Sequence, residues 1–279
     1  MKKFLPVLFI LLFLAGCSSA PATAASPTAA SPTADNLTGR LTFAGSTTMQ
    51  PLVSQLADAF TVLHPNVSMD IAAGGSNVGI KAVHDGTADI GMASRELTAE
   101  EASSITPTTV AIDVLAIVVH KDNPVQSLTL QQLADIYNGQ VTNWKDLGGL
   151  DQEIVPVQRE SSSGSRGAFE ELVLEKQAAS APNLQTAVTA GDVAATISTE
   201  EGAIGYVGFG NLEDSLKLLA INNVTPSQET AKDGTYPLIR PLTLMTGPLS
   251  QPLAQKFVDF AMSDQGQQLI NSLGWIPVK

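Results

Sequence analysis

Apolar residues along this chain change their spacing, from short runs and alternation to every third or fourth position, which marks strands that alternate with helices. An apolar run at 41–44 and an alternating run at 67–72 predict strands, and the stripe over 50–63 between them predicts a helix. A short helix ending near Gly86 and a strand at 89–93 follow. This order predicts an α/β fold with a mostly parallel sheet.

The second half of the chain continues the alternation. Residues 110–120 are nearly continuous in apolar side chains, which is typical of a buried strand in a parallel sheet. Further strands are expected at 154–157, 203–207 and 237–246, and further helices at 128–137, directly after Ser163 and, as one amphipathic helix, over 253–273. No internal repeat is visible in the sequence.

Four short loops rich in Gly, Ser and Thr interrupt this pattern, at 45–48, 74–77, 93–95 and 161–166, and three of them open an expected helix. Backbone N–H groups at a helix start have no intrahelical partner and lie at the positive end of the helix dipole. One such loop is an ordinary helix cap. Several of them predict a shared anion, if the carboxyl ends of the strands bring them together.

The first residues form a leader that is left out of the fold. A basic start and an apolar run over 4–14 precede Cys17, the only cysteine. The run is shorter than the about 20 apolar residues that span a bilayer. The segment resembles a lipoprotein signal peptide (1–16), which implies lipidation of Cys17 and an anchored, non-spanning protein. An ordinary signal peptide with an incidental cysteine is the alternative.

A stretch rich in Ala, Ser, Thr and Pro follows at 17–36, and it cannot bury enough apolar surface to offset its ordering entropy. We interpret it as a tether of roughly 25 Å that holds the remaining chain away from the membrane.

The charge balance limits the partners of this chain. Asp and Glu total 27 against 15 Lys and Arg, a net charge of −12. This excess argues against nucleic acid, whose phosphate backbone requires clustered positive charge. An anion site must therefore depend on local geometry, which screening beyond about 8–10 Å at physiological salt permits.

Several motifs together resemble one family, the phosphate-binding lipoproteins of high-affinity phosphate ABC importers. The matching stretches are GSTTMQPL (45–52), GGSNVGI (74–80), DIGMASR (89–95), IYNG (136–139) with Asn143 and Trp144, the loop 159–166, AIGYV (203–207), YPLIRPL (236–242) and GWIPV (274–278). Each is a weak signal alone, and their order and spacing together are specific. The resemblance extends from about residue 39 to the end of the chain.

The resemblance implies a two-lobed periplasmic-binding-protein fold of the type II-like class, with phosphate enclosed between the lobes. The first lobe would comprise 37–120 and 236–279, and the second 121–235. It also implies a monomeric solute-binding protein without cofactor or metal, lipid-anchored on the outer face of the cytoplasmic membrane or in the periplasm. Such a protein delivers phosphate to the permease subunits of an ABC transporter.

Carried over by position, the resemblance implies the residues that contact phosphate. The first lobe would contribute Ser46, Thr47, Thr48, Ser76, Ser94 and Arg95, and the second Arg159, Ser163, Gly164 and Ser165.

Arg95 departs from the family pattern, because many members carry an acidic residue directly after the serine that matches Ser94. A carboxylate there accepts the proton of hydrogen phosphate and repels sulfate, whereas arginine has no hydrogen-bond acceptor. Glu160 or a backbone carbonyl would then accept the proton, or selectivity against sulfate is weaker. Alternatively, Glu160 forms a simple ion pair with Arg159.

Other functions remain open at this point. The same fold accommodates sulfate, molybdate, tungstate or a small organic anion, and a phosphate sensor or surface adhesin would need the same site. A secreted phosphatase or esterase is disfavoured, because the chain lacks a G-x-S-x-G elbow and an H-E-x-x-H motif. His64, His84 and His120 are isolated from one another in the sequence, which predicts surface or packing roles.

Overall fold

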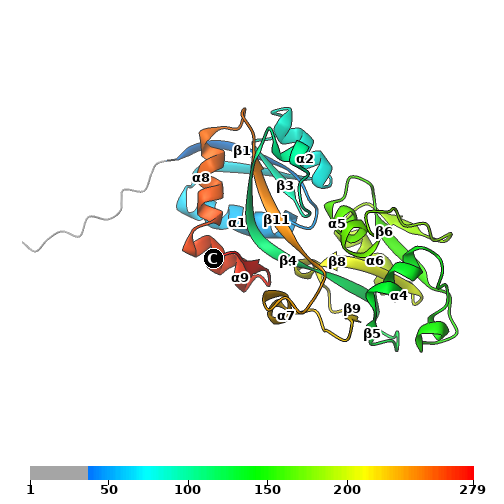
Figure 1. Ribbon diagram of the computed structural model, residues 1–279. Helices are drawn as coiled ribbons and strands as arrows, with labels where there is room; N and C mark the ends of the chain where they lie inside the picture. Colours follow the sequence, from blue (N-terminus) through cyan, green and yellow to red (C-terminus); the bar gives the residue numbers. More distant parts are fainter. Residues whose placement is uncertain (1–36) are drawn as a thin grey trace, which may run out of the picture. The chain divides into compact units, whose positions relative to one another are not determined.

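The computed structural model describes residues 37–279, so the predictions for Cys17, the leader and the tether lie outside the described residues. The main strands pair in one continuous order, β2-β1-β3-β11-β4-β8-β6-β7 (Figure 1). None of the helices in residues 37–279 is both long enough and apolar enough to cross a bilayer.

The strands and helices alternate along most of the chain. The strands are β1 (Thr38–Gly45), β2 (Asn66–Ala73), β3 (Ile90–Ala93), β4 (Thr106–His120), β5 (Ser127–Leu128), β6 (Val155–Arg159), β7 (Gln185–Ala187), β8 (Ala203–Gly208), β9 (Leu216–Leu218), β10 (Ala220–Ile221), β11 (Ile239–Thr246) and β12 (Ile276–Pro277). The α-helices are α1 (Gln50–Leu63), α2 (Ser76–His84), α3 (Ala99–Ala102), α4 (Leu130–Tyr137), α5 (Gly164–Val173), α6 (Ala190–Thr199), α7 (Gln228–Lys232), α8 (Pro252–Ala261) and α9 (Asp264–Ser272).

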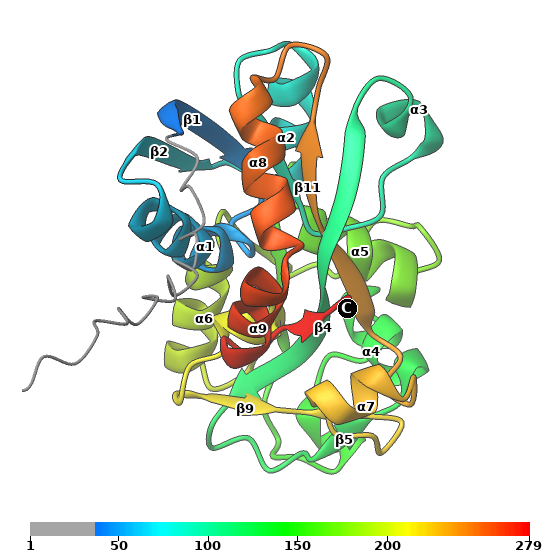
Figure 2. The same cartoon turned by 90° about the vertical axis from the view of Figure 1, so that its left-hand side faces the viewer.

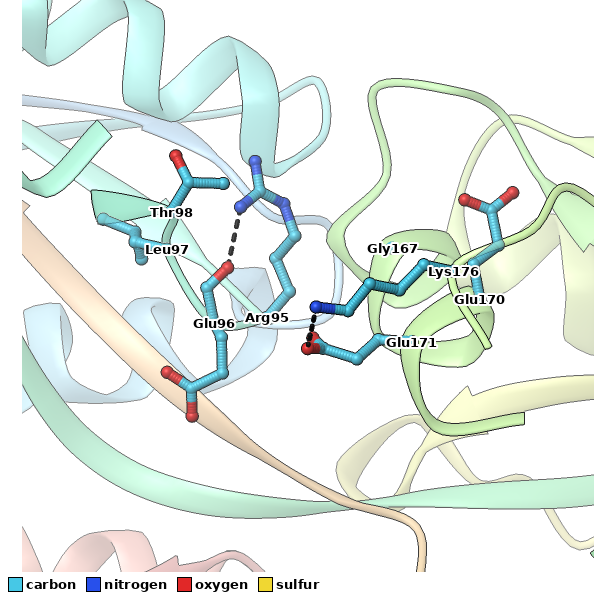
Figure 3. A pocket seen from close by; sticks show the side chains of 8 residues that line it. All are labelled: Arg95, Glu96, Leu97, Thr98, Gly167, Glu170, Glu171 and Lys176. Carbon is cyan, nitrogen blue, oxygen red and sulfur yellow. Dashed lines mark hydrogen bonds and ion pairs between the residues drawn. The ribbon is translucent and has the colours of Figure 1, made fainter. Parts of the chain in front are cut away.

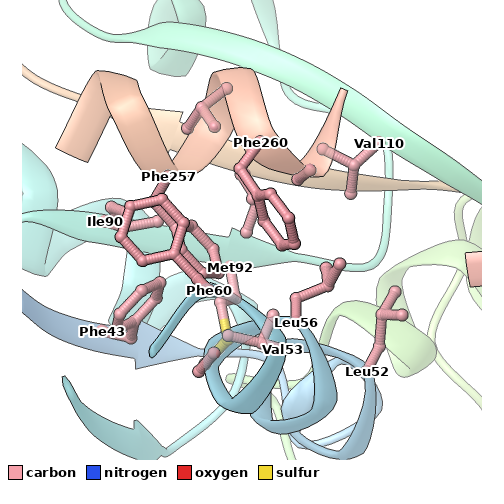
Figure 4. Close-up of a cluster of buried hydrophobic side chains, with 14 of the residues drawn as sticks. Phe43, Leu52, Val53, Leu56, Phe60, Ile90, Met92, Val110, Phe257 and Phe260 are labelled. Carbon is pink, nitrogen blue, oxygen red and sulfur yellow. The ribbon is translucent and has the colours of Figure 1, made fainter. Parts of the chain in front are cut away.

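Three parallel strands, β2-β1-β3, form what we call the first lobe. Helices α1, α8 and α9 cover one face of these strands, and α2 covers the other. The core on the first face is aromatic (Figure 4): Phe257 packs edge-on against Phe43 and Phe60, with ring centroids 4.9 Å and 5.5 Å apart. The expected βα alternation at 41–93 is therefore confirmed, and the helix over 50–63 has the expected bounds.

A second parallel set, β8-β6-β7, forms the second lobe. Helix α6 packs on one face of these strands, and α4 and α5 pack on the other. Helix α5 is capped by Ser163, whose side chain accepts a hydrogen bond from the Arg166 amide, as the sequence predicted. Both lobes thus bring helix starts to the carboxyl ends of parallel strands.

The long strand β4 joins the two lobes and runs through both of them, as Figure 2 shows. It is antiparallel to β11, β12, β8 and β9, so the prediction of a strand of the parallel-sheet type was wrong in its pairing. Its apolar run has another cause, because Val118 faces one hydrophobic cluster while Ile117 and Val119 face the next. Burial on both faces, and not parallel pairing, produced the continuous pattern.

The single helix expected over 253–273 is two helices, α8 and α9, separated by Met262 and Ser263. The Ser263 side chain accepts a hydrogen bond from the Gly266 amide and starts α9 anew. A Cβ on Gly266 would lie only 2.2 Å from the Phe260 carbonyl oxygen, so the chain turns tightly there. An apolar stripe continues through such a turn, which hides the break from a periodicity argument.

Candidate functional site

The hydroxyl groups of the first lobe gather where β1 and β3 end and α2 begins. Ser46 donates a hydrogen bond from Oγ to Oγ of Ser94 at 2.9 Å, and the Ser94 amide donates to Oγ of Ser76 at 3.1 Å. These three residues come from three of the predicted loops. Their strands are adjacent and parallel, so their carboxyl ends share one edge of the sheet.

The start of helix α5 meets this group from the second lobe. Gly164 is its first residue, and a Cβ there would lie 2.1 Å from Oγ of Ser76 and 2.9 Å from Oγ of Ser94. No other residue allows this approach without displacing the serines. The structure therefore brings the loops 45–48, 74–77, 93–95 and 161–166 together, on a helix start whose dipole and free N–H groups favour an anion.

Thr48 and Ser165 make a second contact between the lobes, with 3.1 Å between their hydroxyl oxygens. Thr47 lies nearby and accepts a hydrogen bond from the Ala190 amide at the start of α6, at 3.3 Å. Six hydroxyl residues of this cluster are at most 3% exposed, namely Ser46, Thr48, Ser76, Ser94, Ser163 and Ser165. The predicted hydroxyl residues thus form one largely dry group of donors.

Arg159 ends strand β6 and is 1% exposed. Its Nη2 donates to the Val188 carbonyl at 2.7 Å, whereas its buried Nε has no partner in the described part of the chain. Its backbone amide donates to the Tyr206 hydroxyl at 3.1 Å, and the ring of Tyr206 is stacked on Phe169 of α5 at 4.3 Å. Packing of the lobe core therefore fixes where this arginine lies.

No carboxylate in residues 37–279 forms an ion pair with Arg159. Glu160 instead accepts a hydrogen bond from the Ser162 hydroxyl at 2.7 Å, so the expected alternative of an Arg159–Glu160 ion pair was wrong. Burial lowers the pKa of Arg159, although a guanidinium remains charged. Glu160 and Asp192 oppose this shift from a distance, but neither is bonded to the guanidinium, and an anion within reach of Nε would reduce the cost of burying the charge.

Arg240 and Asp113 belong to the same buried region and were not among the predicted site residues. They face each other across the antiparallel pair β11 and β4, and Oδ2 of Asp113 accepts from Nε and Nη2 of Arg240 at 3.0 Å and 2.8 Å. Arg240 also donates from Nη1 to Ser165 at 2.7 Å and from Nη2 to Thr48 at 3.4 Å. Both hydroxyls accept from Arg240, so their own protons are directed to other partners.

Burial raises the pKa of Asp113, and the Arg240 guanidinium and the Phe209 amide oppose that shift. A signal for this pair was present in the sequence, because Asp113 is the one acidic residue in the apolar run 110–120. A buried acid in such a run requires a partner. The sequence did not indicate which cation, since Arg240 is 127 positions away.

Arg95 follows Ser94, yet its guanidinium has other partners than the hydroxyl cluster. It donates to both carboxylate oxygens of Glu101, at 2.9 Å and 2.7 Å, and to Oδ1 of Asn77 at 2.7 Å. It also lines an open cavity of about 370 Å³ (Figure 3), in which residues 95–98 lie on one side and Gly167, Glu170, Glu171 and Lys176 on the other. The prediction that Arg95 contacts the anion thus has no support in its hydrogen bonds.

A hydroxyl nucleophile would need a base within hydrogen-bond reach. Among residues 37–279, none of the three histidines is hydrogen-bonded to the hydroxyl cluster: His84 contacts Asp85, His120 accepts from the Asp122 amide, and Nδ1 of His64 is without a partner. Asp113 is held by Arg240. The cluster can surround an anion with donors. In loop 161–166 the Ser162 hydroxyl donates to Glu160 at 2.7 Å, but no histidine is bonded to these hydroxyls in residues 37–279.

Two family models match the sequence. One, described as a PBP superfamily domain, covers residues 22–265, and the other, a prokaryotic membrane lipoprotein lipid attachment site, covers residues 1–18. The second match includes Cys17 and confirms the expected lipoprotein leader.

Curated relatives match over the whole chain. The phosphate-binding protein PstS of Bacillus subtilis is 31% identical, covering 100% of this chain and 95% of the relative. The protein of the same name from Pseudomonas aeruginosa is 32% identical, with the same coverage.

Solved structures show the same fold. One is a Clostridium perfringens protein with bound phosphate, whose name places it among phosphate ABC transporter substrate-binding proteins. It has a TM-score of 0.82 at 36% identity, covering 86% of this chain and 100% of that one. An ABC-type phosphate transport receptor from Vibrio cholerae has a TM-score of 0.71 at 34% identity, covering 85% and 99%. The chain belongs to the phosphate-binding protein PstS family, with its periplasmic-binding-protein-like α/β fold and its lipid attachment site.

Proposed function

We propose that this protein captures inorganic phosphate outside the cytoplasm and delivers it to the permease subunits of an ABC transporter. The observation that carries this proposal is Arg159, a buried guanidinium without a carboxylate partner in residues 37–279, in a lobe whose α5 start closes on the serines of the other lobe. The family relationship supports the same function, and no histidine in residues 37–279 is bonded to the hydroxyl cluster, which fits a binding protein better than an enzyme.

The proposed phosphate contacts are the hydroxyl residues of the cluster, the start of α5 and Arg159. They are Ser46, Thr47, Thr48, Ser76, Ser94, Arg159, Ser163, Gly164 and Ser165, with Arg240 orienting Thr48 and Ser165. Each charge-assisted hydrogen bond is worth about 1.5–3 kcal/mol. Several of them suffice for micromolar or tighter binding, which requires about 8 kcal/mol after desolvation of the dianion.

We propose that the lobes move on β4 and β11, the two long strands that cross between them. The boundaries 37–120 with 236–279 and 121–235 stay a proposal, since residues 115–119 of β4 already pair with β8 of the second lobe, and residues 35–279 form one compact unit. Opening would expose the hydroxyl cluster, and closure around phosphate would bury it. The chain would act as a monomer, held near the permease by its lipid anchor.

A second candidate ligand is another tetrahedral oxyanion, such as sulfate or molybdate. The site supports it because its polar groups are mainly hydroxyls, amides and guanidinium groups, which serve any oxyanion. Glu160 is the nearest carboxylate along the loop and is bonded to Ser162. If Glu160 does not accept the phosphate proton, discrimination against sulfate is weak.

Calorimetric titration of the purified chain with phosphate, arsenate, sulfate and molybdate tests both candidates. We expect phosphate and arsenate to bind with dissociation constants at or below micromolar. A ligand at 100 times its dissociation constant also stabilises the fold by about 2.7 kcal/mol, which thermal unfolding detects. Binding of sulfate alone would mean that the ligand is sulfate and not phosphate. No response to any of the four anions would refute the proposal.

A further inference from the structure

Three hydrogen bonds join the loop 74–77 of the first lobe to the loop 161–162 of the second. The Asn77 amide donates to the Ser162 carbonyl at 3.0 Å, and Nδ2 of Asn77 donates to the Ser161 carbonyl at 3.1 Å. The Ser162 hydroxyl lies 3.0 Å from the Gly74 carbonyl oxygen and shares its single proton between that oxygen and the Glu160 carboxylate at 2.7 Å. These bonds can exist only while the lobes are together, and they lie one residue from Ser76 and Ser163.

We call this contact between the loops 74–77 and 161–162 the seam, and the two backbones touch there. Gly75 has a φ of +93°, and a Cβ there would lie 2.4 Å from Oγ and 2.6 Å from the carbonyl oxygen of Ser162. Because no side chain separates the loops, a small rotation of either one breaks the hydrogen bonds. Whether the side-chain bond to Ser161 forms therefore depends on the orientation of the Asn77 amide.

Arg95 fixes that orientation. Its Nη2 donates to Oδ1 of Asn77 at 2.7 Å, which leaves Nδ2 as the group that faces the Ser161 carbonyl. A side-chain amide turned by 180° would place oxygen against oxygen there. The arginine thus selects the one amide orientation that bonds across the seam.

Glu101 in turn fixes Arg95. Both terminal nitrogens of Arg95 donate to the Glu101 carboxylate, and the Arg95 side chain is only 14% exposed. The two parallel bonds hold the planar guanidinium in one orientation. Glu101 also accepts from the Thr98 amide at 2.9 Å, in a capping box that starts α3. The chain of contacts Glu101–Arg95–Asn77–Ser161 therefore runs from a helix of the first lobe to the loop that opens α5.

We propose that Glu101, Arg95 and Asn77 form a latch that holds the lobes closed over the bound anion. They are positioning residues, and Arg95 acts through Asn77 without touching the ligand. This inference deepens the proposed function and rests on it for its ligand. It assigns Arg95 a function in the retention of phosphate, because the latch bonds form only after closure and must break before release.

Stopped-flow measurement of phosphate binding and release by the full chain in detergent tests the latch. For Asn77→Ala and Glu101→Gln we expect release to become about 5- to 30-fold faster, the effect of losing one or two hydrogen bonds. Association should change less than about two-fold, since affinity changes of this kind appear mainly in dissociation. Lys81→Ala and Glu100→Gln, exposed neighbours on α2 and α3, are the matched controls and should leave both rates unchanged.

A double variant separates the latch from a direct contact. Arg95→Gln should accelerate release as Asn77→Ala does, and combining the two should add less than two-fold more. A further large loss in the combined variant, or slower association in Arg95→Gln, would mean that Arg95 contacts phosphate and would overturn the proposal. Unchanged release in Asn77→Ala, with normal binding by the unmodified chain, would also overturn the latch and leave the proposed function intact.

Amide hydrogen exchange reports on the closed form of the lobes, with phosphate and in the fraction that closes without it. The Asn77 amide is bonded to Ser162 across the seam, so we expect Glu101→Gln to accelerate its exchange at least several-fold, with no change in Glu100→Gln. Equal exchange in both variants would refute the latch. If the unmodified chain binds none of the anions, the proposed function fails, and this measurement still decides whether the latch exists.

Discussion

Two neighbouring regions between the lobes use arginine in opposite ways. At the end of β6, next to the loop that opens α5, Arg159 is 1% exposed and has no ion-pair partner in residues 37–279. At the adjoining open cavity, Arg95 is paired with Glu101, which lies outside its lining. Within the cavity Lys176 is paired with Glu171 at 3.5 Å (Figure 3). If the proposed site is correct, a chain of net charge −12 binds its anion with a buried cation that has no ion-pair partner in residues 37–279, whereas the paired cations beside it serve the structure.

The largest expected difference between the regions is in stability. Asp113→Asn leaves Arg240 as a buried charge without a counter-ion, which should lower the free energy of unfolding by about 3–5 kcal/mol. Glu171→Gln breaks an exposed pair of the cavity and should cost about 0–1 kcal/mol. Urea denaturation of both variants measures the contrast, and similar losses would show that burial does not separate the two regions.

Removal of the uncompensated cation should have the next largest effect. Arg159→Ala should weaken phosphate binding by about 2–5 kcal/mol, because a buried partner of a charged ligand is lost. Lys176→Ala in the cavity and Lys256→Ala on the exposed face of α8 should bind phosphate normally. Titration calorimetry compares the three variants. Equal losses at all three positions would contradict the assignment of Arg159.

Two glycines of helix α5 sharpen the comparison, because one faces each region. Gly164→Ala places a methyl group 2.1 Å from Oγ of Ser76, so the lobes cannot close fully, and we expect about a 5- to 150-fold loss of phosphate affinity, the 1–3 kcal/mol typical of overpacking. Gly167→Ala meets Cδ of Arg95 at 2.9 Å and Nε at 3.6 Å, so it should displace the latch arginine and cost no more than the latch variants do. If Gly167→Ala weakened binding as much as Gly164→Ala, close approach at Ser76 would not be the cause.

The smallest expected effect concerns the pH dependence of the cavity region. The Arg95 guanidinium lowers the pKa of Glu101 from 4.5 to about 2. A lowered folded-state pKa contributes stability that is complete above about pH 4.5 and is lost as the pH falls toward 2. The unfolding free energy of the unmodified chain relative to Glu101→Gln should therefore be constant from pH 5 to 7 and decline below pH 4.5. A constant difference down to pH 2.5 would show that the pair is not charged as described.

The local elements could be predicted from the sequence. The stripe over 50–63 gave α1 with its bounds, and Ser163 was recognised as a cap because its side chain satisfies a helix start a few residues away. The hydroxyl loops were also visible, since Gly, Ser and Thr at strand ends have few other structural causes. The errors came where the pattern is shared by two structures, as in the apolar run of β4, whose neighbours are antiparallel, and in the helix over 253–273, which is broken at Met262 and Ser263.

The sequence by itself determined the alternation of strands and helices, the leader that ends at Cys17 and the hydroxyl loops at the helix starts, because each depends on residues within one or two turns of one another. Only the tertiary structure decided which charges are compensated. Asp113 meets Arg240 across 127 positions, Arg95 is bonded to Glu101 and Asn77, and Arg159 forms no ion pair within residues 37–279. Local spacing carries no information about such pairs, since chain packing brings their partners together and excludes the water that would otherwise screen them.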